Sequence, residues 1–246
     1  MAERVAVVTG ASSGIGEATA KALAREGYAV ALAARRQERI NEIAEHISAD
    51  GGKALAIPTD VTDESSARAL IQTANDELGS LDVLVNNAGV MLLGPILGAD
   101  VEHWQRMVGV NLLGLLYCTH PALQIMQEQG GGHIVNVSSV AGRTAGFGSG
   151  VYNATKWGVG AFSESLRQEG ANYNIRVTII EPGFVETELQ GHNENPMVVE
   201  TIEKNRQQIG KVLQADDIAN AILYAVQQPE HVGINEVLVR PTRQRD

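Results

Sequence analysis

Short apolar runs alternate along this chain with longer segments of helical periodicity, and this alternation constrains the possible folds most. Seven runs of four to six residues, several of them rich in β-branched side chains, lie at 5–9, 29–33, 54–58, 83–86, 133–138, 175–180 and 236–239. Helical periodicity covers 14–26, 38–50, 63–78, 100–129, 151–172 and 215–228, with Asp63 and Asp100 placed as N-caps. Several runs are apolar at every position, as in strands covered on both faces. The pattern predicts right-handed βαβ crossovers in a doubly wound α/β fold with a seven-stranded parallel sheet and helices on both faces.

Length and composition favour a single soluble domain over residues 1–246. No low-complexity linker or fixed-period repeat interrupts the 246 residues. The net charge of −10 has the wrong sign for a protein that binds a phosphate backbone, so we expect no nucleic-acid partner. Cys118 is the single cysteine and cannot form an intrachain disulfide, and the N-terminal residues carry no signal-peptide pattern. We therefore expect a cytoplasmic protein with no membrane partner.

A glycine-rich turn joins the first apolar run to the first helical segment. It reads Gly10-Ala11-Ser12-Ser13-Gly14-Ile15-Gly16. Glycines in such a turn permit a tight bend, close approach of a pyrophosphate and close helix packing, and the helix N-terminus attracts the anion. Glycine-rich turns also occur in α/β loops without a ligand, so the turn alone leaves a structural role open. As a binding site it would use Gly10, Ser12, Ser13, Gly14, Ile15 and Gly16.

Further motifs in the same order along the chain carry a family resemblance. The glycine spacing is G-x3-G-x-G, and Asn86-Asn87-Ala88-Gly89, Ser139 and Tyr152-x3-Lys156 follow it. Together with Asp60-Val61 and Pro182-Gly183, these motifs resemble the short-chain dehydrogenase/reductase family over nearly the whole chain. The resemblance implies a Rossmann-type fold, and a homodimer or homotetramer that pairs the 100–129 helix and the Tyr152 helix across a two-fold axis.

The resemblance also implies contacts with a dinucleotide that spacing alone does not give. It places Asp60 and Val61 near the adenine, Asn86 at the adenosine ribose, and Thr187 at the nicotinamide carboxamide. Further cofactor contacts are implied for Asn87, Ala88, Gly89, Tyr152, Lys156, Pro182, Gly183 and Val185. Shorter stretches, including MLLGP, NLLGLLY, FSESLRQE and the closing RPT, resemble the clavaldehyde (clavulanic acid) dehydrogenase branch, which implies reduction of an aldehyde or ketone by NADPH.

The residues after the second run predict which dinucleotide is bound. An acid at this place hydrogen-bonds the ribose hydroxyls of NAD, whereas this chain reads Ala34-Arg35-Arg36. A guanidinium can hold a 2′-phosphate with paired, charge-assisted bonds. We therefore expect NADP(H), with Arg35 as the main contact and Arg36 pointing outward. The alternative is a solvated pair of arginines at the start of a helix.

Tyr152 and Lys156 are the central catalytic candidates. They are four residues apart in a helical segment, so their side chains share one face about 5–6 Å apart at Cβ. The nearby ammonium and an oxidised nicotinamide predict a lowered pKa for the phenol. The resemblance adds Ser139, which would hydrogen-bond the same substrate oxygen, and Asn111, which would hold a water linking the lysine to solvent. The alternative for Asn111 is a polar residue that only bends its helix.

The substrate side is expected at the carboxyl ends of the strands. Residues 184–212, polar and broken at Pro196, are the longest irregular segment and are predicted to form a lid. Arg143, four residues after Ser139, is expected to be a water-exposed loop residue, and the alternative is contact with a substrate carboxylate. Substrate contacts are expected from Met91, Ser139, Ala141, Phe147, Tyr152, Phe184 and Leu189, in a mainly apolar cleft.

These features predict hydride transfer between NADP(H) and the carbonyl or alcohol carbon of a small to medium apolar aldehyde or ketone. Tyr152 is the general acid in reduction and the general base in oxidation. The six histidines show no metal-ligand spacing, so no metal is expected. The alternative is a non-catalytic NADP-binding module that senses redox state.

Overall fold

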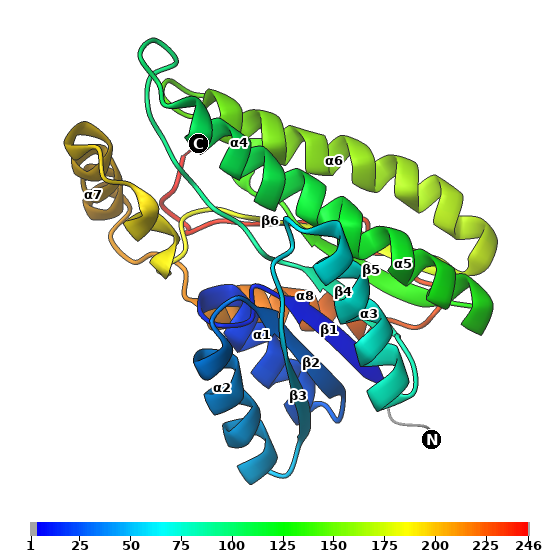
Figure 1. Ribbon diagram of the computed structural model, residues 1–246. Coiled ribbons are helices and arrows are strands. Elements are labelled where there is room, and N and C mark those ends of the chain that lie inside the picture. The colour runs from blue at the N-terminus through cyan, green and yellow to red at the C-terminus, as the bar shows by residue number, and fades with distance from the viewer. Residues whose placement is uncertain (1–3, 246) are drawn as a thin grey trace.

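The seven apolar runs form one parallel sheet in the order β3-β2-β1-β4-β5-β6-β7, in a computed structural model that describes residues 4–245 (Figure 1). Because the order reverses between β1 and β4, the loops after these two strands diverge and leave a crevice between them. The predicted α/β fold with a seven-stranded parallel sheet is confirmed. The strands are β1 (Val5–Thr9), β2 (Ala29–Ala34), β3 (Lys53–Pro58), β4 (Val83–Asn86), β5 (Gly132–Val137), β6 (Ile175–Pro182) and β7 (Glu236–Val239).

Helices cover both faces of the sheet (Figure 1). One face is covered by α1 (Gly14–Arg25), α2 (Gln37–Ala49) and α8 (Ala215–Val226), and the other by α3 (Glu64–Leu78), α5 (Gly114–Gln129) and α6 (Gly150–Gly170). The helix faces that carry Leu23 and Ile40 pack on one side of the sheet, and those that carry Leu70 and Met126 pack on the other. This two-sided cover explains the continuous burial along the central strands.

The helix starts follow the side chains at the caps. The carboxylate of Asp63 accepts bonds from the backbone N–H groups of Ser65 and Ser66 at 2.8 and 3.3 Å, so α3 begins after it. The carboxylate of Asp100 accepts the backbone N–H of Glu102 at 2.9 Å at the start of α4 (Val101–Val108). Both capping predictions are confirmed, since a carboxylate satisfies N–H groups that the first turn leaves without a helical partner.

The segment predicted as one helix over 100–129 is divided by a π-helical turn. The turn spans Gly109–Leu113 and joins α4 to α5. Val101–Gln129 is long enough to cross a membrane, and it contains an 18-residue stretch with a mean hydropathy of 1.2. Its α5 part packs against α3 and its α4 part and π-turn pack against α6, which is the position of a core helix. Core helices of soluble proteins meet the same two criteria.

The segment 184–212 contains regular structure that the sequence analysis did not predict. A 3-10 turn spans Glu188–His192, and α7 spans Pro196–Ile209. Pro196 was interpreted as a break, but it stands in the first turn of α7, where its missing N–H costs no hydrogen bond. The side chain of Asn195 accepts the backbone N–H of Met197 at 3.0 Å and caps the helix. Figure 1 shows α7 standing out from the sheet and its covering helices.

Candidate active site

One cleft at the carboxyl edge of the sheet brings most of the predicted site residues together. It extends from the glycine turn after β1 to the face of α6 that carries Tyr152. The predicted residues that line it are Gly10, Ser12, Ser13, Gly14, Ile15, Arg35, Arg36, Asp60, Val61, Asn87, Ala88, Gly89, Ser139, Tyr152, Lys156, Pro182, Gly183, Val185, Thr187 and Leu189. Those that lie outside the lining are Gly16, Asn86, Met91, Asn111, Ala141, Phe147 and Phe184.

The glycine turn fits the phosphate-binding role at two positions. Gly10 and Gly14 have φ angles of +66° and +56°, a backbone region that side chains with a Cβ rarely adopt. A Cβ on Gly16 would lie 2.3 Å from the carbonyl oxygen of Gly10, so Gly16 lets α1 approach the turn although it does not line the cleft. The Ser13 hydroxyl accepts a bond from Arg36 rather than capping α1. The first turn of α1 is therefore built to face an anion such as a pyrophosphate.

Asn87 holds the loop after β4 against the end of β1. Its side-chain nitrogen donates to the carbonyl oxygen of Thr9 at 3.0 Å. The Thr9 hydroxyl in turn accepts the backbone N–H groups of Asn87 and Ala88 at 3.0 and 3.1 Å. These bonds fix the two walls of the crevice at the point where the strand order reverses.

The side chain of Asn86 does not reach the cleft, so the ribose contact that the resemblance implies stays a prediction for the backbone of this residue. Its side chain is buried and donates to Thr119 Oγ1 at 3.0 Å and to Asn136 Oδ1 at 2.9 Å. Asn136 donates onward to Ser163 Oγ at 2.9 Å. Side chains alternate along a strand, so Asn86 shares the face of Leu84, which packs toward α3, α5 and α6. The buried network of Asn86, Asn136 and Ser163 is not evident from the sequence.

Arg36 points inward, whereas the sequence analysis placed it outward. Its Nε and Nη2 donate to Ser12 Oγ at 3.0 and 2.9 Å, and Nη2 also donates to Ser13 Oγ at 2.7 Å. Its Nη1 forms an ion pair with Glu188 at 2.7 Å. Arg35 also lines the cleft. Both arginines are therefore placed at the glycine turn, and Arg36 has the more extensive contacts.

Tyr152, Lys156 and Ser139 meet at the far end of the cleft. Lys156 Nζ donates to the carbonyl oxygen of Val137 at 2.9 Å and lies 5.8 Å from the centre of the Tyr152 ring. Ser139 follows β5, and its Oγ accepts the backbone N–H of Ala141 at 3.1 Å. The neighbouring Ser138 instead donates to the backbone oxygen of Lys156 at 3.0 Å. The two serines thus have different partners, as the alternation of strand side chains predicts.

Burial controls the ionisation of Tyr152 and Lys156. Burial raises the pKa of Tyr152 to about 12 and outweighs a hydrogen bond from Ser139 that lowers it. Burial also lowers the pKa of Lys156 to about 8. The lowered pKa predicted for the phenol beside both the ammonium and an oxidised nicotinamide stays a prediction for the complex. In the protein by itself, removal of the phenolate from water dominates. The phenol stays protonated at neutral pH, which is the form a general acid needs.

The lowered pKa of Lys156 predicts a pH dependence of stability. The pKa falls from 10.5 to about 8 on burial, so between these pH values the unfolded chain binds the extra proton and the folded chain does not. The free energy of unfolding should therefore rise from pH 8 to pH 10, with a slope of at most about 1.4 kcal/mol per pH unit. The raised pKa of Tyr152 opposes this rise in the free energy of unfolding only above pH 10, where the phenol ionises in the unfolded chain but not in the folded one.

Urea denaturation of wild type and Lys156→Met between pH 7.5 and 10 checks this prediction. The variant should have the flatter pH profile, whatever constant offset comes from the lost bond to Val137. Lys204→Met is the matched control, because Lys204 is exposed and paired only with Glu200 in its own helix. Equal slopes in wild type and Lys156→Met would show that Lys156 titrates at its ordinary pKa.

Asn111 joins the π-helical turn to the loop after β4. Its Oδ1 accepts the backbone N–H of Val90 at 2.8 Å, and its Nδ2 donates to the Val90 carbonyl at 2.9 Å and to Thr155 Oγ1 at 3.2 Å. A Cβ on Gly89 would lie 3.6 Å from Asn111 Oδ1 and 4.0 Å from Lys156 Nζ. Asn111 is thus a buried structural bridge beside the lysine, and the π-turn directs it into the interior.

The expected substrate residues have different positions. Leu189 lines the cleft beside the catalytic end, and Met91 and Ala141 pack against the cluster that contains Tyr152. Phe147 is 90% exposed and outside the cleft, and the backbone N–H of Phe184 donates to Gln244 Oε1 at 2.8 Å. Of these five, only Leu189 therefore lines the cleft directly.

Arg143 is an ion-pair residue rather than a free loop arginine. It pairs with the buried Glu181 at 2.5 Å and with Glu236. Glu181 stands on β6 just before Pro182, so Arg143 connects the turn after Ser139 to the strand that leads into the cofactor wall. The Arg143 side chain is 40% exposed, so the expected water-exposed position is confirmed, while its ion pairs with the two glutamates were not predicted.

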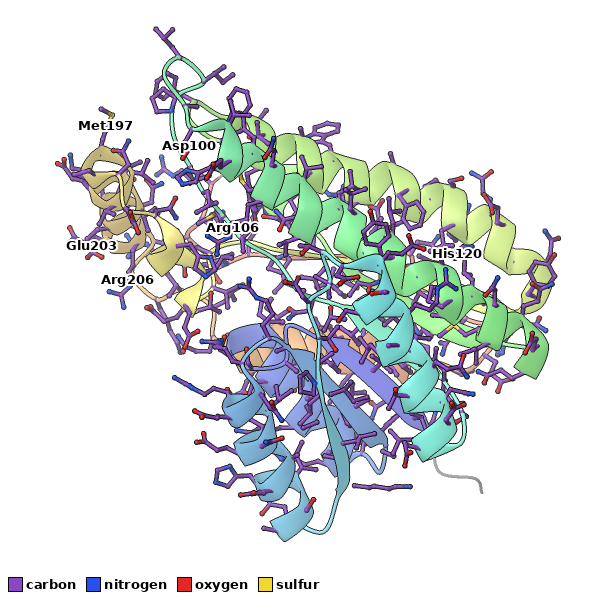
Figure 2. The ribbon with its side chains drawn as sticks, in the orientation of Figure 1. Asp100, Arg106, His120, Met197, Glu203 and Arg206 are labelled. Carbon is purple, nitrogen blue, oxygen red and sulfur yellow. The ribbon has the colours of Figure 1, made fainter. Side chains whose placement is uncertain are left out.

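Several cleft residues were not predicted from the sequence. Val90 and Val110 give it apolar lining, and Gln190 and His192 come from the segment after β6. Burial and the positive charge of Arg106 lower the pKa of His192, so this imidazole is neutral at pH 7. Figure 2 shows Arg106 on α4. Only the tertiary fold brings α4 and the 3-10 turn into proximity, and sequence spacing carries no signal for it.

Comparisons with known proteins point to one family. Residues 4–197 match the family model of the short chain dehydrogenases. The chain is 44% identical over 239 residues to glycine betaine reductase ATRR of Emericella nidulans, covering 97% of this chain but only 19% of that much longer protein. It is 41% identical over 241 residues to an uncharacterized oxidoreductase of Staphylococcus aureus (strain USA300), covering 98% of both chains.

Solved structures show the same fold over nearly the full length. An alcohol dehydrogenase from the archaeon Thermococcus sibiricus, complexed with 5-hydroxy-NADP, superposes with a TM-score of 0.88 at 30% identity and 99% coverage of both chains. A serine dehydrogenase in its closed form, complexed with NADP+, gives a TM-score of 0.89 at 33% identity, covering 98% of this chain and 96% of that one. Fold, motif order and sequence identity thus agree, and the chain belongs to the short-chain dehydrogenase family.

Proposed function

We propose that this protein is an NADP(H)-dependent oxidoreductase that transfers hydride between nicotinamide and the carbonyl or alcohol carbon of a small to medium apolar aldehyde or ketone. The observation that carries the proposal is the meeting of Ser139, Tyr152 and Lys156 in the cleft that the glycine turn enters. Two neighbours of the same fold were crystallised with NADP or a derivative of it, which supports the choice of coenzyme.

In the proposed reaction, the bound nicotinamide supplies or accepts the hydride. Tyr152 donates its hydroxyl proton to the substrate oxygen during reduction and takes it back during oxidation. Ser139 holds the same oxygen by a hydrogen bond, so the substrate carbon stays oriented. Lys156, fixed by its bond to Val137, supplies positive charge beside the phenol when it is protonated. Asn111 is proposed to hold a water that connects Lys156 to solvent.

The coenzyme is proposed to lie along the cleft from Arg35 and Arg36 to Tyr152. The glycine turn would hold the pyrophosphate, Asp60 and Val61 the adenine, and Thr187 the carboxamide. The apolar side chains Val90, Val110 and Leu189 favour a substrate with an apolar body. The segment 184–212 is proposed to act as the lid, with α7 as the moving part.

Replacement of either cleft arginine should change coenzyme preference. Arg36→Ala and Arg35→Ala are each expected to weaken NADPH binding about tenfold or more and to change NADH binding by less than threefold, because a charge-assisted bond contributes about 1.5–3 kcal/mol. Titration calorimetry with both coenzymes measures this. Arg167→Ala is a suitable control, since Arg167 is paired with Glu164 on the exposed face of α6. Equal losses for NADPH and NADH would reject the 2′-phosphate assignment.

The proposed activity is tested by coenzyme consumption over a panel of aldehydes and ketones, with NADPH and NADH side by side. Small aldehydes belong in the panel because of the likeness to the clavaldehyde dehydrogenase branch. Turnover by wild type supports the enzyme, and binding of NADPH without turnover of any substrate supports the alternative, a redox-sensing module.

The proposed assembly is a cytoplasmic homodimer or homotetramer that pairs α5 and α6 with their symmetry mates. These two helices lie side by side on one outer face (Figure 1). Trp157 on α6 is 52% exposed, so a second subunit packed on this face would cover a large aromatic side chain. Light scattering of purified protein measures the mass, and a monomer at micromolar concentration would reject this assembly.

A further inference from the structure

The turn that follows Thr187 places a carboxylate against the guanidinium expected to hold the coenzyme phosphate. Glu188 Oε2 lies 2.7 Å from Arg36 Nη1, although 152 residues separate them in sequence. The remaining nitrogens of Arg36 donate to Ser12 and Ser13 of the glycine turn. Both Arg36 and Glu188 line the cleft. The guanidinium that would bind a 2′-phosphate thus already holds an anion of this chain.

The ion pair is open to solvent and can exchange partners. The Arg36 and Glu188 side chains are 46% and 50% exposed, and exposed ion pairs contribute little to stability. The bond from Arg36 lowers the pKa of Glu188, with help from a bond to Ser13, so the carboxylate is charged at neutral pH. A phosphate dianion accepts more bonds from a guanidinium than one carboxylate oxygen does, so it can displace Glu188.

The backbone around Glu188 keeps the carboxylate near this place after such an exchange. A Cβ on Gly14 would lie 3.1 Å from Thr187 Cγ2, so the segment is packed against the glycine turn. Gln190 Nε2 donates to the carbonyl oxygen of Val185 at 2.8 Å and closes the turn on itself. Glu188 can therefore swing its side chain, but its backbone stays beside the cleft. Its negative charge would remain close to a phosphate held by Arg36.

We propose that Glu188 is a specificity-determining residue for the coenzyme. Its carboxylate competes with the 2′-phosphate for Arg36 and also repels this phosphate. Glu188 therefore reduces the ratio by which the protein binds NADPH more tightly than NADH. The inference rests on the proposed use of NADP(H). NADH carries no phosphate at this place, so the competition acts on NADPH and NADP+ alone. Glu188 thereby moderates retention of the phosphorylated coenzyme, which has to leave after each turnover.

The test compares Glu188→Gln with wild type by titration calorimetry with NADPH and NADH, at about 20 mM and about 300 mM salt. The variant should bind NADPH at least fivefold more tightly and NADH within twofold of wild type. The gain should shrink at high salt, where charges on an exposed surface are screened. In the Arg36→Ala background, Glu188→Gln should have less than half of this effect on the NADPH dissociation constant.

Glu186→Gln is the matched control. Glu186 is an exposed glutamate two residues away that pairs with Arg206 of α7 at 2.8 Å, and Figure 2 shows Arg206 on that helix. The control should leave the ratio of the NADPH and NADH dissociation constants unchanged. Weaker NADPH binding in Glu188→Gln, or an equal change in the dissociation constants of both coenzymes, would overturn the inference. Either result would indicate that the Arg36–Glu188 ion pair helps to hold whichever coenzyme is bound. Wild type that binds neither coenzyme would instead reject the proposed function, and this inference with it.

Discussion

Tyr152→Phe should bind NADPH as wild type does and lose at least a hundredfold in kcat. The substitution removes one hydroxyl from a buried side chain and keeps the ring that packs with Val90 and Met107. General acid–base catalysis contributes typically about 10²–10⁴-fold, so loss of the proton donor should lower the rate within that range. Fluorescence titration with NADPH and steady-state kinetics on an accepted carbonyl substrate measure the two quantities separately.

Tyr224→Phe is the matched control, since Tyr224 is 56% exposed on α8, on the opposite side of the sheet from α6. It should keep both the wild-type rate and the wild-type affinity. If Tyr152→Phe retained more than a tenth of the wild-type kcat, the proton would have to come from another group, and the proposed role of Tyr152 would be wrong.

Asn111→Leu should lower the free energy of unfolding by about 2–4 kcal/mol. Leucine has a similar volume but leaves the backbone N–H and carbonyl of Val90 without their side-chain partner. A buried polar group without a partner costs about 1–3 kcal/mol, and two such groups are affected. Chemical denaturation followed by circular dichroism gives the free energy of unfolding.

Thr155→Val is the comparison variant for Asn111, because it leaves both bonds between Asn111 and Val90 in place. It removes the 3.2 Å acceptor of Asn111 Nδ2 and the 2.7 Å bond from Thr155 Oγ1 to the carbonyl oxygen of Tyr152. It should cost about 1–3 kcal/mol, the contribution of two ordinary hydrogen bonds. Should Asn111→Leu prove as stable as wild type, the Val90 backbone must find other partners, and Asn111 would not be a structural bridge.

The strands and most helices could be predicted from the sequence because their signals are local. β1, β4 and β7 have the predicted bounds, since each is a short run flanked by polar residues or glycine. The start of α3 follows from Asp63, whose carboxylate acts within three residues of chain. α7 was missed because its side chains are nearly all exposed, so no apolar stripe marks it, and because a proline can start a helix as well as end one.

The candidate site could be predicted where a sequence motif fixes the backbone. It was harder to predict where a side chain takes its hydrogen-bond partner from a segment far away in the sequence. Ser139, Tyr152 and Lys156 line the cleft because one strand end and one helix face carry them. Asn86 turned into the core because Thr119 and Asn136, from other elements, provide partners there. The π-turn around Asn111 likewise depends on the Val90 backbone.

The sequence by itself determined the α/β sheet, the glycine turn and the four-residue spacing of Tyr152 and Lys156, since these depend on local periodicity and on residues near one another in the chain. Only the tertiary structure decided the direction of Arg36 and the ionisation of Tyr152. Arg36 turns inward because Ser12, Ser13 and Glu188 converge on it from two distant segments. The phenol keeps its proton because the packed fold removes it from water, and the extent of that burial is a property of the whole domain rather than of neighbouring residues.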